Sequence, residues 1–138
     1  MASFNKFNIF TYDVLAKKHD FTADTFKVAL SNTAPGAANA VLADITQISA
    51  GNGYTSGGTA TSMSLSTSSG TAKATGTDVV FTASGGSIGP ARYAVLYNDT
   101  AASDPLVGWW DYGSSITLAT SETLTVDFDA SNGILTIV

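Results

Sequence analysis

The feature that most constrains the fold is a series of short segments in which apolar and polar residues alternate. In "ETLTVDF", for example, Leu124, Val126 and Phe128 occupy every second position. Side chains of a β-strand point alternately to opposite faces, so this period indicates a strand with one buried face. Such segments recur about every 8–12 residues, separated by glycine, asparagine and aspartate. We therefore predict an all-β fold, a single antiparallel β-sandwich domain of about 8–9 short strands over residues 21–138.

The N-terminal segment, residues 1–20, has a different period. Phe7, Phe10 and Val14 recur at spacings of three and four, which predicts an amphipathic helix, or an arm that becomes helical when packed, over about residues 4–18. The apolar face of such a helix needs a partner, either its own sheet or another molecule. We expect the three apolar side chains to contact a neighbouring subunit, outside the sandwich.

The composition restricts the classes of partner. Only 12% of the 138 residues are charged, the formal net charge is −5, and there is no cysteine. An acidic chain is a poor partner for nucleic acid and for anionic membranes, because both require basic patches. The first residues lack the basic start and apolar stretch of a signal peptide, and no segment has the apolar length of a membrane span. We expect a protein that stays in the cytoplasm and binds neither nucleic acid nor membrane.

Motifs that could carry chemistry are weak. The segment "GGSIG" matches the G-x-S-x-G elbow around Ser87, but a strand-like segment follows it and the single histidine, His19, lies far upstream. Asp127 and Asp129 have the spacing that opens a calcium loop, but Gly133 comes one position late and no glutamate follows it. We therefore predict no enzyme activity, no catalytic residue, no cofactor and no metal.

The two tryptophans stand side by side in "PLVGWWDYG" and must point to opposite faces of a strand. An unpaired carboxylate is costly to bury, so the face that holds Val107, Trp109 and Asp111 is predicted to point outward. Trp110 then belongs to the core. We expect Val107 and Trp109 to contact another subunit, since tryptophan is favoured at the centres of interfaces. A β-bulge in this strand would exchange the two roles.

Three stretches carry a resemblance to a known family: "DTFKVALSNTAP", "ISAGNGYTSGGTA" and the segment from "GPARYAVLYNDT" to "NGILTI". They resemble the capsid decoration, or cement, proteins of tailed phages, from about residue 22 to the end of the chain. Phe81 stands where these proteins often have tryptophan. The resemblance implies a jelly-roll-like β-sandwich on the outside of an icosahedral head, bound over the major capsid protein.

The expected function is therefore that of a structural virion protein, which stabilises the capsid by bridging major capsid protein subunits. Its expected location is the capsid exterior, after assembly in the cytoplasm of the bacterial host. Few charges protect the strand edges, so we also expect a homodimer, or alternatively a trimer. The alternative function is a receptor- or glycan-binding module on the tail or a head fibre. Its sugar-stacking platform would consist of Tyr93, Tyr97, Trp109, Trp110 and Tyr112.

Overall fold

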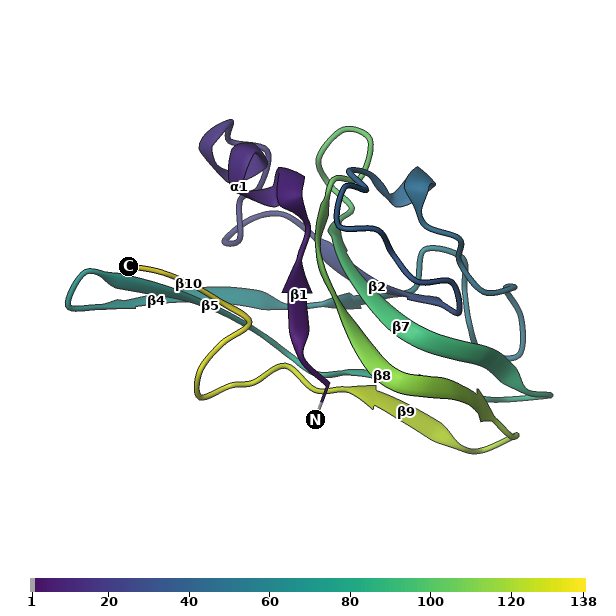
Figure 1. Ribbon diagram of the computed structural model, residues 1–138. Helices are drawn as coiled ribbons and strands as arrows, with labels where there is room; N and C mark the ends of the chain where they lie inside the picture. Colours follow the sequence, from purple (N-terminus) through teal and green to yellow (C-terminus); the bar gives the residue numbers. More distant parts are fainter. Residues whose placement is uncertain (1) are drawn as a thin grey trace.

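The computed structural model describes residues 2–138 and consists mainly of β-strands (Figure 1). The elements are β1 (Phe4–Lys6), α1 (Asn8–Leu15), β2 (Phe26–Ser31), the 3₁₀ helix η1 (Leu42–Asp44), β3 (Thr59–Thr61), β4 (Met63–Ser68), β5 (Thr71–Gly76), β6 (Val79–Thr82), β7 (Ile88–Asn98), β8 (Leu106–Leu118), β9 (Thr123–Val126) and β10 (Leu135–Ile137). A five-stranded sheet has the order β1-β8-β7-β2-β3, and two smaller sheets have the orders β10-β5-β4 and β6-β9. The predicted all-β sandwich with antiparallel strands and a short N-terminal helix is confirmed.

The five-stranded sheet has a core on each face. On one face, Phe26, Val28 and Leu30 of β2 join a large cluster, called here the main core, together with Phe81 and Val126 of the β6–β9 pair. On the other face lies a smaller cluster, called here the second core, which consists of Phe7, Ala29, Ile45, Val95, Tyr97 and Leu106. The side chains of the central strands alternate between the two faces, as predicted, but the side chains on both faces are buried.

The connection between β2 and β3, residues 32–58, covers the second core. It contributes Ile45 to this core, and it contains the single-turn helix η1. The Tyr97 hydroxyl donates a hydrogen bond to the Gly57 carbonyl at 2.6 Å, and the Gln47 side-chain oxygen accepts one from the Gly57 N–H at 2.7 Å. These bonds hold an irregular segment on the sheet, as buried backbone polar groups require.

The N-terminal segment belongs to the same sheet. Residues 4–6 form β1, which pairs antiparallel with β8 and sets Phe4 opposite Trp110. The helix α1 spans only Asn8–Leu15, so the helix predicted over residues 4–18 is wrong at both ends, for residues 4–7 and 16–18. Phenylalanine and asparagine are weak helix formers, and pairing with β8 satisfies their backbone groups instead. Gly108 permits the close approach of β1, because a Cβ atom there would lie 2.6 Å from the Asn5 carbonyl oxygen.

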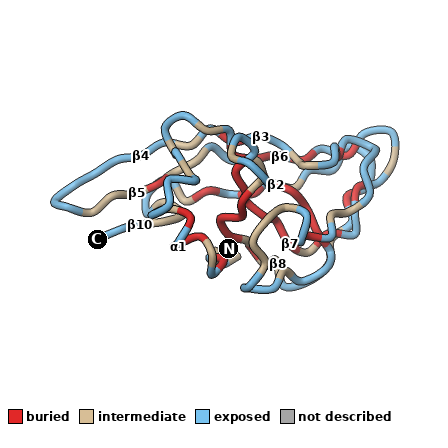
Figure 2. The backbone as a smooth tube through the Cα atoms, turned by 90° about the horizontal axis from the view of Figure 1, so that it is seen from above, coloured by how far each residue is buried: buried red, intermediate tan, exposed pale blue. Residues whose placement is uncertain are grey.

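One part of the molecule projects from the rest. The strands β4, β5 and β10, called here the arm, extend sideways from the sandwich (Figure 1). Seen from above, the arm consists mostly of exposed and half-buried residues, whereas the buried residues gather in the body (Figure 2). The β4–β5 hairpin turns at Ser69 and Gly70, both of which have positive φ. This combination is typical of the tight two-residue turns that join antiparallel strands.

Candidate interaction surface

Two of the residues predicted to contact another subunit lie in the protein's own core. Phe7 is fully buried in the second core, and Phe10 is buried in the main core. Val14 is half-buried and also packs against the main core. The prediction that Phe7 and Phe10 project from the sandwich toward a neighbour is therefore wrong. β1 ties the start of α1 to the edge of the sheet, so the apolar side of the helix reaches its own body first.

Val107 was predicted to point outward, and this is also wrong, because it is fully buried in the main core. The cause is a bulge in the pairing of β7 with β8. Leu96 lies opposite Gly108, but the next residue of β7, Tyr97, lies opposite Leu106, so Val107 is an extra residue. An extra residue of this kind reverses the faces of the residues before it. Val107 consequently shares a face with Trp110.

The bulge precedes both tryptophans in the chain, so it does not change which of them faces the main core. Trp110 is 4% exposed and packs edge-on against Phe4 and Phe128, with ring centroids 4.9 and 5.0 Å away. Its predicted place in the core is confirmed. Trp109 is half-buried on the opposite face, where its ring centroid lies 4.6 Å from that of Phe7. Part of Trp109 remains open to solvent, and its contact with another subunit remains a prediction.

Asp111, beyond the tryptophans on β8, is held by an ion pair. Its two carboxylate oxygens accept hydrogen bonds from Nε and Nη2 of Arg92 at 2.8 and 3.2 Å. A third bond comes from the Gly113 N–H at 2.8 Å. The Arg92 hydrogen bonds, followed by that from Gly113, lower the pKa of Asp111. The Asp111 carboxylate therefore stays ionised at neutral pH and is engaged in these hydrogen bonds. It is a poor candidate for a general acid or base.

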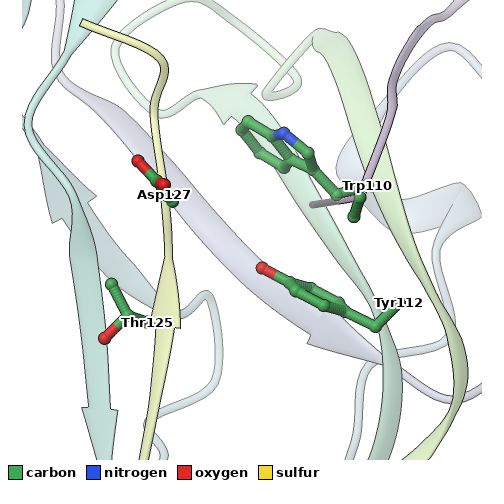
Figure 3. Close-up of a pocket in the computed structure, with 5 residues that line it drawn as sticks. Trp110, Tyr112, Thr125 and Asp127 are labelled. Atoms are coloured by element: carbon green, nitrogen blue, oxygen red, sulfur yellow. The ribbon is translucent and has the colours of Figure 1, made fainter.

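The five aromatic residues of the expected sugar platform do not share one surface. Trp110 and Tyr112 pack on the main-core side of the sheet, whereas Tyr97 and Trp109 pack on the second-core side. A pocket of about 210 Å³ does open beside the first pair, between β8 and the end of β9 (Figure 3). Its lining residues are Ala2, Trp110, Tyr112, Thr125 and Asp127. Burial, reinforced by Asp127, raises the pKa of Tyr112 to about 12, so its hydroxyl is protonated at neutral pH.

The weak chemical motifs have ordinary structural roles. Ser87 is exposed in a turn that leads directly into β7, whereas a nucleophile elbow leads into a helix. The Asp129 carboxylate accepts hydrogen bonds from the backbone N–H groups of Ser131 and Asn132, both at 2.9 Å, which closes the turn before β10. Among residues 2–138, no three histidine or acidic side chains lie close enough together to hold a metal ion.

The arm carries the apolar surface that the sequence reading missed. The pairing of its three strands aligns Leu65 with Ala74 and Leu135, and Thr67 with Ala72 and Ile137. Since aligned residues share a face, one face of the arm is apolar and the other carries Ser64, Ser66, Lys73, Thr75 and Thr136. The base of the apolar face packs on the main core through Met63 and Leu135. Its outer half is open: Leu65 is 49% exposed and Ile137 is 61% exposed.

A second exposed apolar pair lies on α1. Tyr12 and Leu15 are largely exposed on the side of the helix away from Phe10. Exposed apolar side chains that gather on one part of a soluble protein mark interaction surfaces.

The sequence contained a signal for the open face of the arm. Between Met63 and Gly76, Leu65 is the single large aliphatic residue. Two strands with so few large side chains cannot fill a core.

No helix in the described part of the chain is long and apolar enough to cross a membrane. Comparison of the chain with protein-family models, with curated proteins and with solved structures found no match.

Proposed function

We propose that the protein is a structural virion protein, a cement or decoration protein on the outer surface of an icosahedral phage head. It would stabilise the capsid by bridging major capsid protein subunits. The observation that carries this proposal is the arm, a sheet with one open apolar face that projects from a body packed on both sides of its central sheet. The resemblance of the sequence to tailed-phage decoration proteins supports the same assignment.

The division into body and arm suits a protein that spans a seam between subunits. The body is rigid because its central strands are buried on both faces, so it can transmit force without unfolding locally. The edge strand of the arm, β4, offers uncharged side chains and open backbone groups at a distance from the body. Many copies of such a clamp, each adding a few kcal/mol, would raise the barrier to rupture of a shell.

The location and partners follow from the same proposal. The partners are the major capsid protein and the protein itself, as a homodimer or alternatively a trimer. The site is the capsid exterior, reached after assembly in the host cytoplasm. The net charge of −5 favours a position away from the packaged nucleic acid, because an acidic surface is repelled by phosphates.

The test is reconstitution on capsids that lack the protein. Purified protein added to such capsids should bind in hundreds of copies per particle and raise the temperature at which the shell releases its DNA. Copy number is measured by quantitative gel analysis, and the position by image reconstruction. Binding in a single ring of copies at a tail would contradict the proposal and favour a tail protein. No binding to the shell at all would overturn it.

The pocket beside Trp110 favours a second candidate, a receptor- or glycan-binding module. The Tyr112 hydroxyl points into the space between the two layers toward Thr125 and Asp127 (Figure 3). A phenol, a hydroxyl and a carboxylate could bind the hydroxyl groups of a sugar. A glycan array tests this candidate, with Asp127→Ala as the matched variant. Binding of one sugar class that the variant loses would support the module, whereas an array without signal would remove it.

A further inference from the structure

The arm contains β4, the longest of the strands that form the edge of a sheet in the described part of the chain. Within residues 2–138, β4 pairs only with β5 and forms the outer strand of the sheet β10-β5-β4. It has six residues, whereas the other edge strands have three or four. Its sequence, "MSLSTS", contains no charged residue and no proline. Natural edge strands are commonly protected by such residues, or by being short, and β4 has neither protection.

The hairpin turn determines which backbone groups of β4 are free. The two-residue turn at Ser69 and Gly70 closes on the pair Ser68 and Thr71. In a hairpin of this type the closing pair is hydrogen-bonded, and hydrogen-bonded pairs then alternate along the ladder. Ser68, Ser66 and Ser64 therefore bond to β5, and the residues between them direct their N–H and C=O groups away from the sheet. The outward residues are Met63, Leu65 and Thr67.

These three residues also lie on the apolar face of the arm, because side chains two positions apart share a face. Leu65 stands at the centre, with one outward residue on each side. A strand of this kind complements itself. When a second copy is related by a two-fold axis that is perpendicular to the sheet and lies midway between the two Leu65 residues, every outward residue of one copy faces an outward residue of the other. The serines between them meet serines, so polar side chains also match.

We propose that β4 pairs antiparallel with β4 of a second copy of this chain, about a two-fold axis at Leu65. Leu65 then faces Leu65 of the second copy, and Met63 faces Thr67. Each facing pair exchanges two backbone hydrogen bonds. The two arms become one continuous sheet whose apolar face spans both copies. This inference deepens the proposed function, because it names the surface for self-association.

The distribution of charge favours a second copy as the occupant. The chain has a net charge of −5, so two copies repel one another wherever their acidic surfaces meet. The strands of the arm contain one charged residue, Lys73, whose ammonium group donates to the Ser131 carbonyl at 2.7 Å on the polar face. Pairing through β4 therefore joins two acidic molecules at a nearly neutral edge. The same patch serves both copies, as a two-fold contact requires.

A single cysteine tests the register directly, because the chain has none of its own. In a hydrogen-bonded antiparallel pair the two Cα atoms are about 5.5 Å apart, a separation that a disulfide can span. Leu65→Cys should therefore form a covalent dimer under mild oxidation at low protein concentration. The matched control is Val80→Cys on β6, since Val80 is 50% exposed and Leu65 is 49% exposed. The control should remain largely uncoupled, and equal coupling of the two variants would overturn the proposal.

Charge at the same position provides a second test. Leu65→Lys places like charges face to face and should raise the dimer dissociation constant by at least about tenfold, measured by sedimentation equilibrium. Leu65→Glu should do the same, and an equimolar mixture of the two variants should restore dimers. Val80→Lys is the control and should leave the constant unchanged. Circular dichroism verifies that each variant is folded. If Leu65→Lys fails to fold, the Leu65→Cys variant still tests the pairing.

The outcomes for this inference and for the proposed function can be distinguished. Wild-type protein that stays monomeric at high micromolar concentration, or dimers that survive Leu65→Lys, would overturn the pairing through β4. Either result leaves the capsid reconstitution untouched, because that experiment measures attachment to the shell. Conversely, a β4-paired dimer that never binds capsids would sustain this inference and remove the proposed function.

Discussion

The body and the arm use the same alternation of side chains with opposite results. In the body, β2 and β7 have one face on the main core and the other on the second core, so most of their residues are buried. In the arm, β4 and β5 have one apolar face that is covered only at its base and one polar face in solvent. The difference comes from what lies over each face rather than from the strands. A change in the body should therefore affect folding, and a change in the arm should affect association.

The largest expected effect comes from removal of residues 1–18. This deletion takes away β1, the edge of the central sheet, and removes Phe7 and Phe10 from the two cores. We expect the remaining chain to lack a cooperative unfolding transition in circular dichroism. The control is Tyr12→Ser combined with Leu15→Ser, which changes exposed residues of α1 and should leave the fold intact. A truncated chain that unfolds cooperatively would show that the N-terminal segment is an accessory to the body.

Trp110→Ala should have the next largest effect. The variant loses a ring that is 4% exposed and packed between Phe4 and Phe128. Large-to-small substitutions of buried aromatic residues lower the free energy of unfolding by about 3–5 kcal/mol. Urea denaturation followed by circular dichroism measures the change. A loss below about 1 kcal/mol would contradict the position of Trp110 in the main core.

Trp109→Ala should cost less, about 1–2 kcal/mol, because its ring is half-buried and its main aromatic contact is Phe7. The two neighbouring tryptophans lie on the same strand but on opposite faces of the sheet. A difference in stability between the two variants therefore reports on the two faces. If both variants lose the same stability, Trp109 is as much a core residue as Trp110. If Trp109→Ala loses none, the second core does not depend on it, and its ring is free for a partner.

A smaller effect should appear between neutral and mildly acidic pH. Burial lowers the pKa of His19 below 6.5, although Asp13 and Asp24 oppose the shift. Asn98 Nδ2 lies 3.3 Å from His19 Nδ1, which suits a neutral ring that accepts a hydrogen bond there. The unfolded chain takes up the proton at higher pH than the folded one, so stability is complete above pH 6.5 and falls as the pH drops toward the folded pKa.

The measurement for His19 is the urea midpoint at several pH values from about 8 to 5. His19→Gln should flatten the dependence on pH in this window. Asp111 and Asp129 also have lowered pKa values, through hydrogen bonds to Arg92 and to Asn132, but they act only near and below their ordinary pKa of 3.8. An unchanged slope in the variant would mean that the loss of stability does not come from His19.

The smallest expected effect on folding is that of Leu65→Ser in the arm. At a protein concentration too low for self-association, the free energy of unfolding should change by no more than about 0.5 kcal/mol, as exposed positions allow. The contrasting substitution is Val126→Ser, in which a fully buried residue of the main core is changed. A large loss for Leu65→Ser would mean that the outer half of the arm is part of the folding unit, and the distinction between body and arm would fail.

The sequence by itself determined the local structure of this protein. The period of two in "ARYAVLYND" and "ETLTVDF" depends only on neighbouring residues, so it predicted strands and their shared faces correctly. The same rule placed Trp110 in the core, because β8 pairs with β7 without interruption from Gly108 to Asp111. The tight turn between β4 and β5 was likewise readable from glycine and small polar residues.

The tertiary structure alone decided what covers each face. No local pattern shows that residues 32–58 fold over the second face, which is why Phe7 becomes a core residue although it was predicted to face a neighbour. The bulge that turns Val107 inward depends on the register of β7 against β8, a contact between distant parts of the chain. The open face of the arm has the same origin, because alternation specifies which side chains share a face and long-range packing determines whether anything lies over it.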